Sequence, residues 1–165
     1  ILTSADRAKD FPNKPVYILG TGESVETPMV SQMETFNSSR AFKVAGPTAF
    51  REAGIAHKDV DHLMIYDAFA HLPLYGLEDL GFCARGEAAA FIREGHTRPG
   101  GRLPVNTNGG LLSEVHVWGL NNVVETARQL KHEVGERQVT DAELAIVTGY
   151  GDLGDGSLAV LGRGR

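Results

Sequence analysis

The sequence has little cysteine, no excess of basic residues and no long apolar run, and each shortage excludes a class of protein. Cys83 is the one cysteine among 165 residues, which excludes an internal disulfide framework and a metal site built on paired cysteines. The net charge of −5 argues against binding to a phosphate backbone. No apolar run approaches the ~20 residues that span a bilayer. We expect a globular protein that fits the reducing cytoplasm, with no nucleic-acid partner and no membrane span.

We expect no secretion signal in the first residues, because "ILTSADRAKDFPNKP" lacks a basic start, an apolar core and a cleavage site. The chain opens on Ile1, and "ILTS" is typical of the end of a buried strand. We therefore expect that further residues precede Ile1. A length of 165 residues suits a single α/β domain with a core of its own.

Short β-forming runs bounded by proline or glycine predict strands. They are "PVYILGTG", "HLMIYDAF", "ELAIVTGY" and "GSLAVLG". The last two, joined by "GDLGD", indicate an antiparallel hairpin. Residues 23–45 are mixed and polar, which predicts a long irregular excursion with some helix. Together with "ILTS", these runs predict a mixed five-stranded sheet.

Helices are predicted between the strands. Ser4 caps a short helix to Lys9, and Pro47 begins a helix that ends at Ala53 with Gly54 as its cap. Pro73 opens another that stops at Gly81, and "GEAAAFIREG" forms a fourth. The longest runs from Leu111 to Lys131, with a helical apolar period that predicts one face on the sheet. The alternation indicates an α/β fold with helices on both faces of the sheet.

Three segments follow strands or lead into a helix where ligands gather in open α/β sheets. They are "YDAF", "NTNGGLLSEVH" and "GYGDLGDG". A long helix beginning near Ser113 would place His116 in its first turn, where the helix dipole favours a neutral imidazole. Such an imidazole can act as a base or donate to an oxyanion.

Each candidate residue has a plainer interpretation. His116 could be a partly buried histidine bonded to a carbonyl, Tyr66 an interface tyrosine rather than a proton donor, and Asp67 is better explained as a cap than as a catalyst. Gly109 and Gly110 permit close backbone approach to a ligand, as do the glycines at 149, 151, 154 and 156, but turns need glycine equally often. "GTGES" has neither a Walker lysine nor GxGxxG, so it is no phosphate loop.

In their order and spacing, "YDAF", "NTNGGLLSEVHVWG" and "GYGDLGDGSLAVL" resemble the C-terminal half of the thiolase superfamily. The resemblance is to sterol-carrier-protein-x type thiolases and the related lipid-transfer-protein aldolases, and it covers nearly the whole chain. The Asn/His-Glu/Asp-Ala-Phe motif of the family falls on Tyr66 to Phe69. The Gly-Gly and Gly-His-Pro motif falls on Gly109-Gly110 and on residues 115–117. The third motif falls on residues 150–156.

The resemblance implies roles for particular residues. His116 stands where the thiolase histidine activates the nucleophile and helps to form an oxyanion hole, and Tyr150 stands about where the acid/base cysteine would be. Asn108 and Asp67 support the site. The amides of Gly109, Gly110 and Gly151 become candidate oxyanion donors.

The departures from the thiolase pattern indicate which branch this is. The acid/base cysteine is absent, valines flank His116, and Tyr66 replaces Asn or His. Cys83 does not match the nucleophilic cysteine, which lies in the N-terminal half of thiolases. Tyrosine in place of thiolase residues resembles the aldolase branch, whose members cleave β-hydroxyacyl-CoA thioesters, including steroid side-chain intermediates. Tyr66 and His116 are the expected acid–base pair, and the sequence leaves open which of them is the acid and which is the base.

The expected function is therefore retro-aldol cleavage of an acyl-CoA, with coenzyme A entering as part of the substrate and no covalently bound cofactor or metal. The alternatives are a thiolase or acetyltransferase, and a noncatalytic module that binds lipid or acyl-CoA. The resemblance also implies a dimer of two-halved subunits and a small partner protein with an OB fold and a zinc ribbon. An isolated half would expose apolar surface and is expected to oligomerise.

Overall fold

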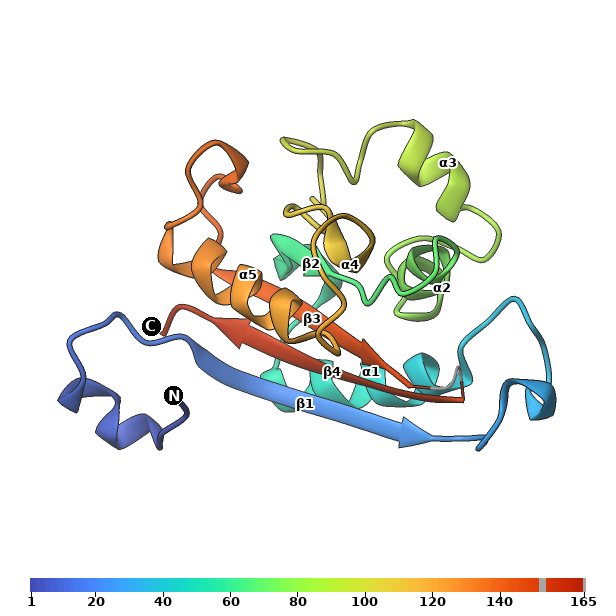
Figure 1. The fold of residues 1–165 in the computed structure, drawn as a ribbon, viewed down its shortest axis with the longest axis horizontal. Coiled ribbons are helices and arrows are strands. Elements are labelled where there is room, and N and C mark those ends of the chain that lie inside the picture. Colours follow the sequence, from blue (N-terminus) through green and yellow to red (C-terminus); the bar gives the residue numbers. More distant parts are fainter. Residues whose placement is uncertain (152–153, 165) are drawn as a thin grey trace.

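A computed structural model describes residues 1–151 and 154–164 and contains one four-stranded sheet (Figure 1). The strand order is β1 (Tyr17–Val25), β4 (Asp155–Gly162), β3 (Leu144–Tyr150) and β2 (His62–Met64). Strand β4 runs antiparallel to both β1 and β3, whereas β2 runs parallel to β3. The sheet is mixed, and the predicted hairpin is confirmed as β3 and β4.

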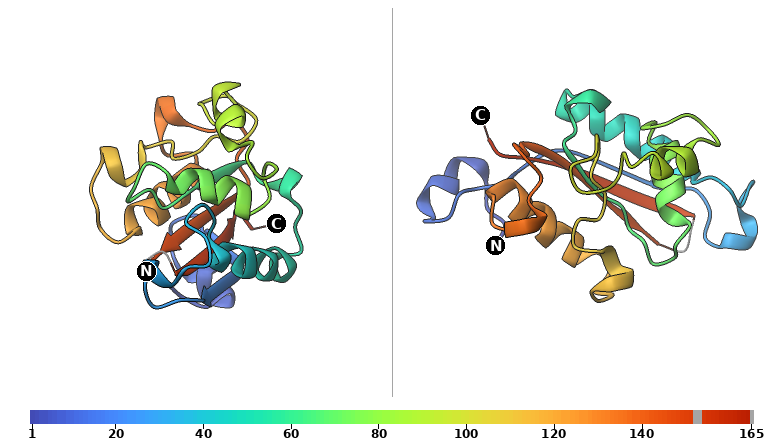
Figure 2. Two further views of the ribbon diagram at one scale, coloured as in Figure 1. Left: turned by 90° about the vertical axis from the view of Figure 1, so that its right-hand side faces the viewer. Right: turned by 90° about the horizontal axis from the view of Figure 1, so that it is seen from above.

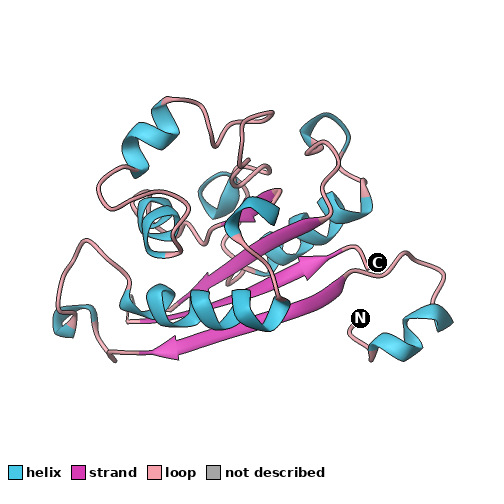
Figure 3. Ribbon diagram, turned by 180° about the vertical axis from the view of Figure 1, so that it is seen from behind, coloured by secondary structure: helices cyan, strands magenta, loops and turns pink. Residues whose placement is uncertain are grey.

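Helices cover both faces of this sheet, as predicted. Helix α1 (Arg40–Ala53) packs on β1 and β4, and α5 (Leu120–Lys131) lies on the opposite face, mainly against β3 and β2 (Figures 2 and 3). The helices predicted around residues 73–81 and within 86–95 form as α2 (Leu72–Asp79) and α3 (Ala88–Arg93). No helix within the described residues has the length and apolar character needed to cross a membrane.

The remaining elements are short. They are the 3₁₀ turns η1 (Ala5–Asp10), η2 (Val30–Gln32), η3 (His57–Asp59) and η4 (Gly135–Arg137), and the one-turn helix α4 (Gly110–Ser113). The first predicted helix therefore exists as a 3₁₀ turn, and the Ser4 side chain makes no capping hydrogen bond. Strand β1 runs on to Val25, into the segment that the sequence predicted to be irregular.

The prediction of a fifth strand is wrong for the residues that the structure describes. Ile1 and Leu2 are exposed and belong to no strand. A strand needs a neighbouring strand for its backbone hydrogen bonds. The edge strand that follows Ile1 and Leu2 in the chain is β1, and a side chain already binds part of its free edge. The amide of Thr21 in β1 donates to the carboxylate of Glu52, 2.7 Å away.

Helix α1 begins earlier than the sequence predicted, at Arg40 rather than at Pro47. Ser39 caps it by accepting a hydrogen bond from the amide of Phe42. Pro47 lies inside the helix on its exposed side, where water can hydrate the carbonyl that proline leaves without a donor. Burial of the opposite side, which includes Phe42, outweighs the cost of the proline. Gly54 ends the helix in a left-handed conformation, as predicted.

Two glycines in β1 allow α1 to approach the sheet closely. A Cβ on Gly22 would lie 2.1 Å from the carbonyl oxygen of Ala45, and a Cβ on Gly20 would lie 2.5 Å from that of Ala49. Both contacts are shorter than van der Waals separation, so only glycine fits beneath the helix backbone. The "GTG" sequence therefore serves packing, consistent with its lack of a phosphate-loop pattern.

The predicted helix from Leu111 to Lys131 is broken in two. Helix α4 ends at Ser113, and α5 begins at Leu120. Between them, Trp118 and Gly119 have φ angles of 55° and 81°, which no α-helix accommodates. The helical spacing of apolar residues between 112 and 123 continues across this break, so here it does not indicate a single helix. His116 consequently lies in the connecting loop, and the helix-dipole argument for its neutral state no longer applies.

Helix α5 buries mostly polar residues, whereas the sequence predicted an apolar face. Its buried residues are Asn122, Glu125, Thr126, Gln129 and Leu130. The helical period places Leu120 and Val123 on the buried face. Both are exposed, as is Val124, with exposed fractions of 41–66%. Burying polar side chains is tolerated only when they find hydrogen-bond partners. Several of these do, in loops that the helix contacts.

Candidate active site

The two residues that the sequence proposed as acid and base lie in contact. The hydroxyl of Tyr66 is 2.6 Å from Nε2 of His116, although 50 positions separate them in the chain. Tyr66 follows β2 at its carboxyl end and is held there by a hydrogen bond from its amide to Oγ1 of Thr148 in β3. Tyr66 is buried, whereas His116 is exposed on the loop between α4 and α5.

The surroundings of Tyr66 keep its hydroxyl protonated. Burial, and then the charge of the neighbouring Asp67, raise the pKa of Tyr66 above its usual value. A protonated phenol can donate to an imidazole nitrogen that carries no hydrogen, and 2.6 Å is the length of a strong hydrogen bond. The Trp118 ring lies 5.6 Å from the His116 ring and borders the pair. The arrangement can therefore hold and exchange one proton.

Asp67 stabilises the start of α4, although the two are far apart in the sequence. Its Oδ1 accepts a hydrogen bond of 2.8 Å from the amide of Leu111, in the first turn of that helix. Gly110 lies directly over this carboxylate, since a Cβ there would be 2.1 Å from Oδ2. The sequence favours Asp67 as the cap of the turn or helix that follows it, whereas its carboxylate bonds to an amide 44 positions further along the chain.

The amides of Gly109 and Gly110 are already engaged, which counts against their expected role as oxyanion donors. The amide of Gly109 donates to the carbonyl of Asn106 at 2.7 Å, and that of Gly110 donates to Oδ1 of Asn108 at 3.0 Å. Asn108 also donates from Nδ2 to Glu114. Both glycines have positive φ, so they shape the turn instead.

Tyr150 is directed away from the expected cluster, toward α1. Its ring packs edge-on against Phe42, with centroids 4.8 Å apart. Burial raises the pKa of Tyr150 to about 12, although a hydrogen bond with Ser39 acts in the opposite direction. Gly151 follows it, and the next residues of the third motif, Asp152 and Leu153, lie outside the described residues. Thr148, in β3 directly before the third segment, accepts a hydrogen bond from the Tyr66 amide.

Sequence reasoning missed Asn106, which joins the two loops of the site. Its Oδ1 accepts from the amide of Ile65 at 2.8 Å, and its Nδ2 donates to the carbonyl of the same residue at 3.0 Å. Asn106 has a φ of 49°, a conformation that asparagine tolerates better than most residues. Its place before a Thr-Asn-Gly-Gly turn was the one signal that could have indicated it.

A hollow of about 930 Å³ borders the site and is lined by the start of α5, by β1, β3 and β4, and by α1. Trp118, Gly119, Leu120 and Val123 line it from the start of α5, and Thr148 lines it from β3. Gly119 also packs against the Tyr66 ring, because a Cβ there would lie 3.2 Å from Cδ2 of Tyr66. Among residues 1–151 and 154–164, no three His, Cys, Asp or Glu side chains gather as a metal site would require.

Comparison with known proteins agrees with this architecture. Residues 22–163 match the family model described as thiolase C-terminal domain-like. The chain belongs to this family. The resemblance drawn from the three motifs is therefore confirmed.

Relatives of known activity differ in the reaction that they catalyse. The 17-hydroxy-3-oxo-4-pregnene-20-carboxyl-CoA lyase of Mycobacterium tuberculosis is 34% identical over 135 residues, which are 79% of this chain and 35% of the lyase. The acetyl-CoA acetyltransferase of Methanothermobacter thermautotrophicus is 32% identical over 163 residues, which are 97% of this chain and 42% of the transferase. A solved Ltp2-ChsH2(DUF35) aldolase matches with a TM-score of 0.90 and 32% identity, covering 98% of this chain and 43% of that one. The chain thus spans less than half of each relative.

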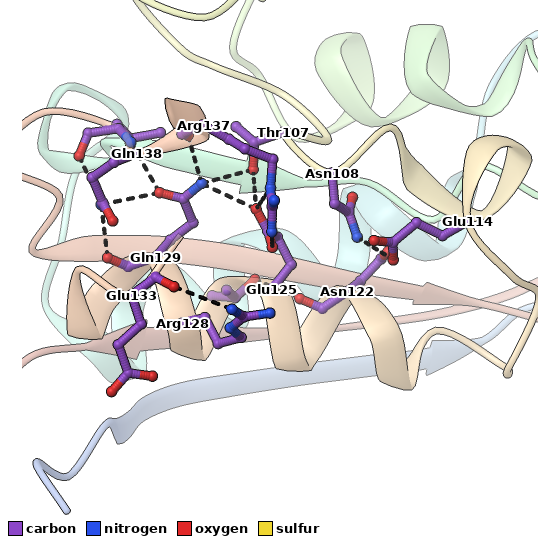
Figure 4. A network of polar contacts seen from close by, with 12 residues as sticks. Thr107, Asn108, Glu114, Asn122, Glu125, Arg128, Gln129, Glu133, Arg137 and Gln138 are labelled. Atoms are coloured by element: carbon purple, nitrogen blue, oxygen red, sulfur yellow. Dashed lines mark hydrogen bonds and ion pairs between the residues drawn. The ribbon is translucent and has the colours of Figure 1, made fainter. Parts of the chain in front are cut away.

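Beside the site, this thiolase-type domain contains a buried polar network (Figure 4). The carboxylate of Glu125 in α5 accepts hydrogen bonds from Thr107, Gln129 and Arg137. Burial opposes ionisation of Glu125, but these three donors outweigh it and hold the pKa of the carboxyl below its usual value. Gln138 and the amide of Val139 bond to Gln129 in turn.

Thr107 fixes the protonation of His62 within this network. Its hydroxyl donates to Glu125 at 2.8 Å, so it must accept from Nε2 of His62 at 3.1 Å and from Gln129 at 3.0 Å. His62 therefore carries a proton on Nε2. Nδ1 is buried without a hydrogen-bond partner in the described part of the chain. Burial lowers the pKa of His62 to about 4, although the charge of Glu125 acts against this shift.

Acid should destabilise the protein through His62. Above pH 6.5 the imidazole is neutral in both states, and its contribution to stability is complete. As the pH falls from about 6.5 to about 4, His62 binds a proton in the unfolded chain but not in the folded chain. At ~1.4 kcal/mol per pH unit, the loss sums to about 3 kcal/mol. Urea unfolding of the whole protein at pH 7.5 and pH 4.5 measures it.

The control is His62→Gln, which keeps an N–H donor for Thr107 but does not titrate. The stability of this variant should fall less between the two pH values than that of the wild type. Equal losses in the two proteins would show that His62 is not responsible.

Proposed function

We propose that this chain is the C-terminal domain of an enzyme that cleaves a β-hydroxyacyl-CoA by retro-aldol reaction. The observation that carries the proposal is the 2.6 Å contact between the Tyr66 hydroxyl and Nε2 of His116, at the carboxyl end of β2. A retro-aldol reaction needs a base for the β-hydroxyl and an acid for the thioester enolate. A protonated tyrosine beside an exposed histidine offers one of each.

The two side chains divide the proton transfers as follows. His116 accepts the proton of the β-hydroxyl, the Cα–Cβ bond breaks, and its electron pair moves into the thioester as an enolate. Tyr66 donates its proton to Cα, which releases a carbonyl compound and a shortened acyl-CoA. The raised pKa of Tyr66 suits a donor better than a base. Return of one proton from the imidazolium to the tyrosinate, across the 2.6 Å contact, restores the starting state.

The substrate class follows from the family and from the lyase. We propose an acyl-CoA with a β-hydroxyl on a bulky, steroid-like group, in which coenzyme A is part of the substrate and no bound cofactor takes part. Of the oxyanion donors suggested by the sequence, the Gly151 amide remains a candidate, because it follows β3 at the same sheet edge. The 34% identity with the M. tuberculosis lyase supports the proposed substrate class.

Claisen chemistry is the second candidate, since the acetyltransferase matches 97% of this chain. One observation weakens it. Tyr150 stands at the position of the family's acid/base cysteine and packs against Phe42. Burial raises the pKa of Cys83 to about 11, which agrees with the expectation that this thiol is not the nucleophile of the family.

We also propose that the working enzyme contains more than this domain. Large apolar side chains around the site are exposed, including Leu112, Val115, Trp118 and Leu120. Surface of this kind is normally covered in a working assembly. The Ltp2-ChsH2(DUF35) match supports a partner protein. For this partner we propose the OB fold and zinc ribbon that the resemblance implies, and for the enzyme a homodimer in the cytoplasm.

The test is product analysis with the whole protein as its organism makes it. We expect 17-hydroxy-3-oxo-4-pregnene-20-carboxyl-CoA to give a ketone and an acyl-CoA, detected by mass spectrometry, without added coenzyme A. Cleavage of a β-ketoacyl-CoA that requires coenzyme A would favour the thiolase alternative. Binding of both thioesters without turnover would favour the noncatalytic module.

A further inference from the structure

One loop, residues 106–111, holds Tyr66 from both sides. Asn106 bonds to the amide and the carbonyl of Ile65, the residue before Tyr66. The amide of Leu111 bonds to Asp67, the residue after it. The position of the Tyr66 backbone therefore depends on where this loop lies.

The same loop leads into the segment that carries His116. Asn108 donates to the carboxylate of Glu114 at 2.7 Å, two residues before His116. A displacement of the loop would thus move both members of the pair. Proton transfer is sensitive to such movements, since an error of about 1 Å in geometry can reduce a rate about 100-fold.

Thr107 connects this loop to the far side of α5. Its hydroxyl uses one donor and two acceptor positions, on Glu125, His62 and Gln129. Glu125 is in turn bound by the Arg137 guanidinium, with distances of 3.3 Å from Nε and 3.0 Å from Nη2. The Glu125 side chain is only 4% exposed, and the ion pair with Arg137 of η4 offsets the cost of burying its charge. Figure 4 shows the chain of contacts from Arg137 to Thr107.

We infer that Thr107, fixed by Glu125 and Arg137, is a positioning residue for the Tyr66–His116 pair. The inference rests on the proposed function, because it assigns the network to the same site. A purely structural network would affect the stability of α5 and η4, but not the rate of the chemical step in a folded enzyme. A positioning network lowers kcat and leaves KM nearly unchanged, since substrate contacts are retained.

The test compares one substitution at two positions of the whole protein. Thr107→Val removes the hydroxyl and keeps the shape of the side chain. Thr126→Val makes the same change at a buried threonine of α5 whose hydroxyl bonds to the carbonyl of Asn122 in its own helix. We expect kcat to fall at least 10-fold in Thr107→Val with KM within about threefold of wild type, and to stay within about twofold in Thr126→Val. Thr107→Ser restores the hydroxyl and should recover most of the rate.

A second readout does not need a known substrate. Hydrogen exchange followed by mass spectrometry should show faster exchange in the peptides covering residues 65–67 and 106–111 of Thr107→Val, and no such change in Thr126→Val. If no thioester is cleaved by the wild type, the proposed function fails and the exchange data alone decide the inference. Equal kcat values, or equal exchange, in the two valine variants would overturn it.

Discussion

Replacing Tyr66 by phenylalanine is expected to lower kcat for thioester cleavage by about 10²- to 10⁴-fold, the usual contribution of a general acid. The change removes one oxygen from a buried ring and leaves the ring contacts in place. The enolate then has no donor at Cα, and His116 loses the partner that is 2.6 Å away. Steady-state kinetics of the whole protein, with KM measured separately, provide the test.

Tyr75→Phe is the matched control, because the Tyr75 hydroxyl donates to the carbonyl of Phe36, on the segment preceding α1. It should keep kcat within a few-fold of wild type. His116→Ala combined with Tyr66→Phe should cost little more than either change alone, since the two groups act as a unit. Additive losses would mean that the side chains work independently, and an unchanged rate in Tyr66→Phe would remove the acid from the mechanism.

The candidate pair could be predicted from the sequence because residue type and motif order carry that information. Tyr66 ends an apolar strand, His116 follows a Gly-Gly pair, and both fall on motifs of one family. The structure brings them into contact, whereas their roles stay predictions. Their contact could not be predicted, since it depends on two loops that meet through Asn106 and Asp67.

The main errors concern α5 and the segment before it. A helical apolar period continued through Trp118, and nothing local showed that this residue adopts a positive φ. The same period placed polar residues such as Glu125 outside, because propensity and periodicity ignore hydrogen bonds to distant loops. Glu125 and Gln129 are buried because Thr107 and Arg137 satisfy them. Tertiary partners, not the local pattern, decided which polar side chains of this helix are buried.

The same reasoning explains why the sequence leaves two interpretations of Gly109 and Gly110 open. A Gly-Gly pair before a helix permits an oxyanion site and a tight turn equally well. Only the positions of Asn106, Asn108 and Asp67 distinguish the two, and these favour the turn.

Gly110 should consequently be among the least replaceable residues of the domain. Gly110→Ala is expected to cost about 3–5 kcal/mol in the free energy of unfolding. About 1–2 kcal/mol comes from an alanine at φ 69°. The rest comes from the Asp67 carboxylate, which must leave its place 2.1 Å from the new Cβ and give up its bond to Leu111, a charged hydrogen bond worth about 1.5–3 kcal/mol. Urea unfolding at neutral pH measures the total.

Gly54→Ala separates the two contributions. Gly54 has a φ of 67°, nearly that of Gly110, but a Cβ there meets nothing within 4 Å. It should lose only the 1–2 kcal/mol of conformational strain and keep full activity. In Gly110→Ala, displacement of Asp67 also moves Tyr66, its neighbour in the chain, so kcat should fall even where the protein remains folded. If the two alanine variants were equally stable, the Asp67 carboxylate would not need the space that Gly110 leaves open. If they were also equally active, the contact of Asp67 with Leu111 would not hold Tyr66 in place.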